Sequence, residues 1–120
     1  MREKSDKGYH RLLVWQRAKE LVVLVYKITE KLPKSEEFGL KSQTRRAAIS
    51  VLSQIAEGYS RKSAKDKKRF VEISIGSLFE LESDFEVALE LRYVTLVDYE
   101  AFDQKRGEVG YLLDRYYKSI

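Results

Sequence analysis

The chain of 120 residues contains no cysteine, one histidine and one proline. Without cysteine it can form neither a disulfide nor a thiolate metal site. This absence is typical of proteins of the reducing cytoplasm, and we expect a cytoplasmic protein. The single histidine, His10, excludes the paired Glu-x-x-His motifs of di-iron helical bundles. One proline and six glycines leave little material for turns, so the sequence predicts long elements joined by short connections.

Long hydrophobic runs are also absent. The longest, "LVVLVY" at 21–26, is far shorter than the roughly 20 residues of a membrane-spanning helix. The first eleven residues, "MREKSDKGYHR", are polar and lack the apolar segment of a signal peptide. We therefore expect a soluble protein in which residues 1–11 form a polar tail and residues 12–120 form one domain.

The motifs of common catalytic sites are missing as well. The sequence has no nucleophile motif, no glycine-rich phosphate loop and no grouping of serine, histidine and aspartate. It therefore predicts a protein that is not an enzyme and holds no cofactor or metal. One run of carboxylates stands out, and we interpret it either as a solvated helix face or as the acidic partner of a neighbouring subunit's basic patch. His10 is predicted to be an exposed tail residue. The acids are Glu80, Glu82, Asp84, Glu86 and Glu90.

Four segments show the apolar spacing of helices. The first, over 13–32, carries a stripe with helical spacing. Its members are Val14, Ala18, Leu21, Val25, Ile28 and Leu32. The second begins between residues 35 and 40 and is predicted to end at Gly58 as a helix-terminating glycine. The pattern shows no strand-like alternation.

The third and fourth helices have capping signals at their starts. Ser63 and Thr95 are each followed three residues later by an aspartate, which is a capping-box-like pattern. These segments extend to about residues 91 and 117. The sequence therefore predicts an all-α, antiparallel, up-down-up-down four-helix bundle.

Several features favour an oligomer. The first and third helices are apolar around more of their circumference than one small bundle can bury, and Phe79 lies on an otherwise polar side as a candidate intersubunit contact. Ser50 and Ser53 lie on a narrow face of the second helix that another backbone can approach closely.

Charge is divided unevenly along the chain. Residues 1–70 carry 18 basic and 8 acidic side chains, whereas residues 71–120 carry 5 basic and 11 acidic ones. The densest block, "RKSAKDKKR" at 61–69, is typical either of a solvated helix start or of a surface that binds polyanions. The candidate nucleic-acid-binding residues are Arg46, Arg61, Lys62, Lys65, Lys68 and Arg69.

Two adjacent arginines at the start of the second helix allow two interpretations. Guanidinium groups bind phosphate in a bidentate manner, but they also form structural ion pairs. Arg45 lies beside the core edge of the predicted helix, where it would pair with Glu80 or with Glu57 of another chain, and only Arg46 points outward.

Four motifs carry a resemblance to a known family. They are Trp15-Gln16-x-Ala18, residues 43–48 ("QTRRAA"), residues 55–58 ("IAEG") and residues 76–81 ("GSLFEL"). The chain, over about residues 12–117, resembles the four-helix-bundle family encoded in intervening sequences of bacterial 23S ribosomal RNA genes. That family is related to the accessory variability protein of diversity-generating retroelements. Leu52 stands where the family usually has a proline, which predicts a straighter second helix.

The resemblance implies a bundle that assembles into a ring, typically a homopentamer. It also implies a basic surface for nucleic acid, since the retroelement relatives pair with a reverse transcriptase and bind nucleic acid. We therefore predict a non-enzymatic accessory protein that binds RNA or an RNA/DNA hybrid. The alternative is a protein–protein scaffold ring that recruits a partner such as a reverse transcriptase without contacting nucleic acid itself.

Overall fold

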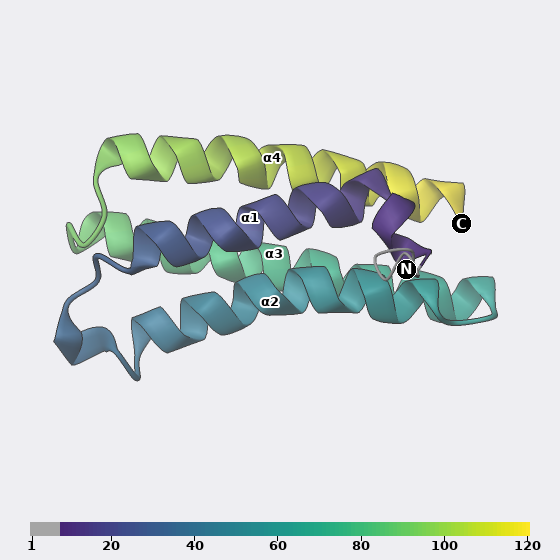
Figure 1. Cartoon of the computed structure of the whole chain (residues 1–120), viewed down its shortest axis with the longest axis horizontal. Helices are drawn as coiled ribbons and strands as arrows, with labels where there is room; N and C mark the ends of the chain where they lie inside the picture. Colours follow the sequence, from purple (N-terminus) through teal and green to yellow (C-terminus); the bar gives the residue numbers. More distant parts are fainter. Residues whose placement is uncertain (1–7) are drawn as a thin grey trace, which may run out of the picture.

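The computed structural model describes residues 8–120, which form four long α-helices and two short 3-10 helices (Figure 1). In chain order the helices are η1 (Tyr9–Arg11), α1 (Leu13–Thr29), η2 (Lys34–Glu36), α2 (Leu40–Tyr59), α3 (Ala64–Glu90) and α4 (Leu96–Ser119). These residues contain no strand, so the predicted all-α, four-helix fold is confirmed. Of the predicted polar tail, residues 1–7 lie outside the described part. No helix within residues 8–120 is long and apolar enough to span a membrane.

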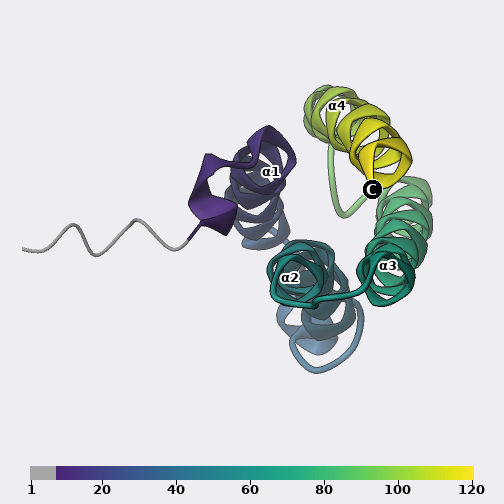
Figure 2. The same cartoon turned by 90° about the vertical axis from the view of Figure 1, so that its right-hand side faces the viewer.

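The connections divide between the two ends of the bundle. The α1–α2 and α3–α4 connections lie at one end, and the α2–α3 turn lies at the other end, together with η1 and the C-terminus (Figures 1 and 2). The basic block of residues 61–69 is therefore brought to the same end as η1, although about fifty residues separate them in the sequence.

The apolar stripe predicted for the first helix forms one side of the core. All six of its members are buried, and Ala18, Leu21 and Val25 are completely so. On the opposite side, the rings of Phe85 in α3 and Phe102 in α4 stack with centroids 3.7 Å apart. Burying each large apolar side chain stabilises the fold by about 1.5–3 kcal/mol. Two apolar residues with helical spacing in the third segment, Ile73 and Leu91, are exposed.

Both predicted capping residues begin their helices. Ser63 Oγ accepts a hydrogen bond from the Asp66 amide at 3.1 Å, and Thr95 Oγ1 accepts one from the Asp98 amide at 3.0 Å. Each bond satisfies an amide that has no partner inside the helix. The end of α3 is different, because Arg92 takes a left-handed conformation with φ of 63° and the Tyr93 amide donates to the Ala88 carbonyl at 2.9 Å. That is the Schellman geometry, formed here without a glycine.

A line of polar and small residues joins α2 to α3. Gln43 Nε2 donates to Asp84 Oδ1 at 2.9 Å, the Ser50 and Ser77 hydroxyls lie 2.8 Å apart, and Ser74 Oγ donates to the Val51 carbonyl at 2.7 Å. Residue numbers therefore rise along α2 as they fall along α3. The helix that approaches Ser50 is α3 of the same chain, whereas Ser53 is exposed and does not meet α3.

Gly58 continues this close approach and does not end its helix. The helix runs through it to Tyr59, and Gly58 is buried, so the prediction that it terminates α2 is wrong. A Cβ atom at Gly58 would lie 2.9 Å from Phe70 Cβ and 3.4 Å from the Lys67 carbonyl oxygen. Glycine is required here by the distance between two helices and not by a left-handed backbone.

Replacing Gly58 by alanine should destabilise the fold by about 1–3 kcal/mol, because α2 and α3 must separate to accept the methyl group. Gly76→Ala is a matched control within α3, where an added Cβ meets no atom within 4 Å. Gly76→Ala should stabilise by roughly 0.5–1 kcal/mol through helix propensity. Urea unfolding at one fixed protein concentration measures both, and equal effects of the two substitutions would contradict this account of Gly58.

Candidate nucleic-acid interface

The basic block of residues 61–69 occupies the α2–α3 turn and the first turns of α3. Ser63 caps α3 in the middle of it, so basic side chains both precede and follow the helix start. Lys62 and Lys65 are exposed and make no hydrogen bond or ion pair with other residues of the described part. They are the two lysines of the block whose ammonium groups are not engaged by another side chain of the described residues.

The other cations of the block lie against aromatic rings. The Arg61 and Arg69 guanidinium groups are 4.6 and 4.9 Å from the ring centroid of Phe70, and Lys68 Nζ is 5.3 Å from that of Tyr117. Arg61 also forms an ion pair with Glu57 one turn earlier. Cation–π contacts at exposed sites contribute about 0.5–1 kcal/mol each, and they leave the outer side of each cation open to an anion.

Lys67 links the block to the end of α2. Its Nζ donates to the Tyr59 carbonyl at 2.9 Å and lies 5.3 Å from the centre of the Tyr59 ring. Lys67 thereby gives a hydrogen-bond donor to a carbonyl at the C-terminus of α2 that has no partner inside the helix. The helix dipole also favours a positive charge at a C-terminus. Tyr59 itself is exposed.

Arg46 lies apart from the block. It is exposed on α2, 13 residues before Tyr59, which corresponds to about 20 Å along a helix. Its neighbours in a shallow depression include Phe38 and Ile49. The structure therefore brings together Arg61, Lys62, Lys65, Lys68 and Arg69 and leaves Arg46 near the opposite end.

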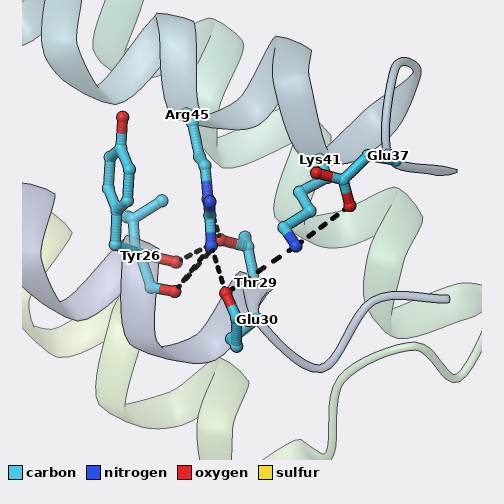
Figure 3. A network of polar contacts seen from close by, with 7 residues as sticks. Tyr26, Thr29, Glu30, Glu37, Lys41 and Arg45 are labelled. Carbon is cyan, nitrogen blue, oxygen red and sulfur yellow. Dashed lines mark hydrogen bonds and ion pairs between the residues drawn. The ribbon is translucent and has the colours of Figure 1, made fainter. Parts of the chain in front are cut away.

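Arg45 is held in a network with α1 (Figure 3). Its Nε donates to Thr29 Oγ1 at 2.9 Å, and its Nη2 donates to the Tyr26 carbonyl at 3.0 Å and to Glu30 Oε1 at 3.1 Å. The guanidinium also lies 4.4 Å from the centre of the Tyr26 ring. Arg45 is therefore structural, but the partners predicted for it, Glu57 and Glu80, are wrong.

Lys41 extends the same network. Its Nζ lies 3.2 Å from Glu37 and 3.7 Å from Glu30. The hydrogen bond from Arg45 and the charges of Lys41 and Arg45 lower the pKa of the Glu30 carboxyl. The bonds across the α1–α2 interface use donors of Arg45 that would otherwise be available to phosphate.

Substituting Arg45 by alanine should lower the free energy of unfolding by about 1–3 kcal/mol, because Arg45 makes three hydrogen bonds at a partly buried position. Its neighbour Arg46 provides the control, and Arg46→Ala should change stability by less than about 0.5 kcal/mol. Thermal unfolding followed by circular dichroism measures the difference. A loss of stability in Arg46→Ala as large as in Arg45→Ala would show that the network does not distinguish the two arginines.

The acidic run of α3 is not uniformly solvated. Asp84 is buried, contrary to the predicted solvated face, and its Oδ2 has no hydrogen-bond partner in the described residues. Burial raises the pKa of the Asp84 carboxyl; the Gln43 hydrogen bond opposes this shift and nearby Glu80 adds to it. No group of three or more potential metal ligands occurs among the residues that the structure describes.

A second exposed feature is apolar and lies between α3 and α4. A groove of about 340 Å³ there is lined by Leu78, Phe79, Gly107, Gly110 and Tyr111, among others. Phe79 and Tyr111 are 65% and 60% exposed, and nothing lies within 4 Å of a Cβ placed on Gly107. Large exposed apolar side chains around a groove are typical of a protein interaction surface.

The sequence interpretation missed an aromatic cluster at the basic end. Tyr9 and His10 in η1 pack against Trp15 in α1, and their ring centroids lie 5.1 and 4.8 Å from that of Trp15. His10 is therefore partly buried and not an exposed tail residue. The three residues lie within seven positions of one another, but their polar flanks concealed the contact.

Comparison with known sequences matches residues 10–115 to the family described as 23S rRNA-intervening sequence protein. Among solved structures, the chain is similar to a crystal structure from Bacteroides thetaiotaomicron, described as a protein with unknown function from the S23 ribosomal protein family. The two are 23% identical, the alignment covers 88% of this chain and 99% of that one, and the TM-score is 0.81. At this identity the likeness supports the fold alone. No curated protein matches the chain.

Proposed function

We propose that this chain, which belongs to the 23S rRNA-intervening sequence protein family as its motifs predicted, is a non-enzymatic accessory protein that binds RNA or an RNA/DNA hybrid. In this proposal the antiparallel bundle assembles into a homopentameric ring in the cytoplasm. The observation that carries it is the gathering of six basic side chains at the end of the bundle that holds the α2–α3 turn.

The mechanism is electrostatic. Lysines and arginines that neutralise phosphates release condensed counterions, and this gain does not depend on base sequence. The N-terminus of α3 lies within the block and adds a favourable dipole for phosphate. A ring repeats the block in every subunit, so a structured RNA that matches the repeat would bind several blocks at once.

Ring assembly is supported by apolar surface that one chain leaves uncovered. Besides the α3–α4 groove, Phe38 is 95% exposed in the α1–α2 connection. The basic first half and the acidic second half of the chain are complementary, which favours contact between unlike faces of neighbouring copies. Head-to-tail contacts of this kind close into a ring when the rotation between neighbouring copies completes a full turn.

Both ring assembly and nucleic-acid binding are tested by the mass of the purified protein in solution, measured with and without a structured RNA. Light scattering should give a homo-oligomer that persists in high salt, because apolar burial holds it together. Its complex with RNA should weaken steeply between about 50 and 200 mM salt. A monomer at every salt concentration would overturn the ring, and an oligomer that ignores RNA at low salt would overturn nucleic-acid binding.

The double substitution Lys62→Ala/Lys65→Ala should weaken RNA binding and reduce the dependence of log affinity on log salt by about one unit for each phosphate that is no longer neutralised. A matched control is Lys27→Ala/Lys34→Ala, which removes the same charge from exposed lysines away from the block. Fluorescence anisotropy of a labelled RNA measures both. Equal losses of affinity in the two variants would assign binding to net charge and not to the block.

The exposed apolar groove favours a second candidate function. Here the ring is a protein–protein scaffold that recruits a partner such as a reverse transcriptase without contacting nucleic acid. Phe79 and Tyr111 would then be contact residues for the partner or for the next copy. The scaffold predicts an oligomer that does not bind RNA even at low salt, which the same light-scattering experiment detects.

A further inference from the structure

We propose that the ligand of the basic end is single-stranded RNA, and that Trp15 and Tyr9 supply a stacking surface for its unpaired bases. This inference rests on the proposed nucleic-acid function and narrows it, since charge neutralisation alone does not distinguish single strands from duplexes.

The rings of η1 and α1 are fixed in place. Gln16 Nε2 donates to the His10 carbonyl at 2.7 Å, which ties η1 back onto the first turn of α1. Tyr9, His10 and Trp15 then contact one another with ring centroids 4.6–5.1 Å apart. Trp15 and Tyr9 remain only partly buried. Rings held this way lose little freedom when a base stacks on them, which reduces the entropic cost of binding.

A surface depression adjoins the rings. It has a volume of about 440 Å³ and lies between Trp15 and Tyr9 on one side and α2 on the other. Ile49 and Leu52 give it an apolar part, and the short side chains of Ser53 and Ala56 leave room beside the rings. On the other side of Trp15, Lys19 Nζ lies 5.4 Å from the ring centroid. A flat base beside an aromatic ring and near a cation has the environment of a stacked nucleotide.

The depression ends beside the basic block. Glu57 and Ser60 form its far edge, and the carboxylate of Glu57 is already paired with Arg61. Gly8 packs so closely on Tyr59 that a Cβ atom there would lie 2.8 Å from Tyr59 Cε2, and Lys67 lies over the same tyrosine ring. The aromatic cluster and the cations therefore form one continuous surface, which Figure 2 views from its end of the bundle.

This combination favours unpaired bases. In a duplex the faces of the bases are covered by their neighbours, so a protein ring beside the helix has no base to stack on. In a single strand the bases can splay towards aromatic rings while the phosphates follow a basic path. Stacking of this kind tolerates any base, which agrees with a surface that offers few groups for reading base edges.

Trp15 is the only tryptophan of the chain, so its fluorescence reports on this ring alone. We expect a uridine oligonucleotide to quench the emission of the full-length protein at low salt, and added salt to restore it. A blunt RNA duplex with the same number of phosphates should bind through the cations and leave the emission unchanged. Anisotropy of the labelled RNAs, measured in parallel, reports binding independently of Trp15.

Substitutions separate stacking from folding. Tyr9→Leu keeps an apolar side chain in η1 and should reduce affinity for the single strand by about 5- to 150-fold, the range expected when one base no longer stacks. Tyr93→Leu, at a partly buried tyrosine in the α3–α4 connection at the opposite end of the bundle, is the control and should leave affinity unchanged. Circular dichroism confirms that both variants fold.

The outcomes distinguish this inference from the proposed function. Binding of RNA without a change in Trp15 emission, or equal quenching by the duplex, would overturn single-strand stacking and leave the nucleic-acid function standing. Acrylamide should quench Trp15 emission in the RNA-free oligomer. If it does not, another copy covers Trp15, and single-strand stacking is overturned too. No binding of either RNA at low salt would overturn the proposed function itself.

Discussion

The close approach of α2 and α3 is the constraint on which the rest of the molecule depends. Gly58 allows the two helices to touch near the turn, and the Ser50–Ser77 and Ser74–Val51 hydrogen bonds hold them together along their length. A slip of one turn between the helices would separate these partners and leave buried hydroxyls unsatisfied. The same register sets the conformation of the turn between them, and so the position of the basic block relative to η1.

Most of the fold could be predicted from regular patterns in the sequence. The stripe from Val14 to Leu32 and the caps at Ser63 and Thr95 are local signals, because each depends on residues within one or two helical turns. The positions of the glycines predicted the helix ends less well. Gly58 lies inside a helix, whereas α3 ends at Arg92, a non-glycine residue with positive φ. The role of Gly58 follows from a contact with another helix, which spacing along one helix does not reveal. At Arg92 the closing hydrogen bonds are made by backbone atoms, so they do not require a glycine that the sequence would display.

The candidate site was only partly predictable for the same reason. Exposed cations such as Lys62 and Lys65 are evident from composition, but the partners of Arg45 come from another helix, and its preference for Glu30 depends on how α1 and α2 are aligned. The contact of Tyr9 with Trp15 requires the chain to reverse at η1. Arg45 and the basic block thus have separate roles, one at an interhelical interface and the other at the open end of the bundle.

The buried carboxyl of Asp84 makes the stability of the fold depend on pH. Burial raises its pKa above the usual 3.8, so the native chain keeps a proton that the unfolded chain loses over the interval between the two values. In that interval the native state binds more protons, and the free energy of unfolding falls as pH rises. Below this interval the carboxyl is neutral in both states, so Asp84 adds no pH dependence. Above it the native state holds a buried charge whose main compensation is the Gln43 amide. Folding of this bundle is therefore coupled to proton uptake at Asp84, and mild acid favours the native state at that position.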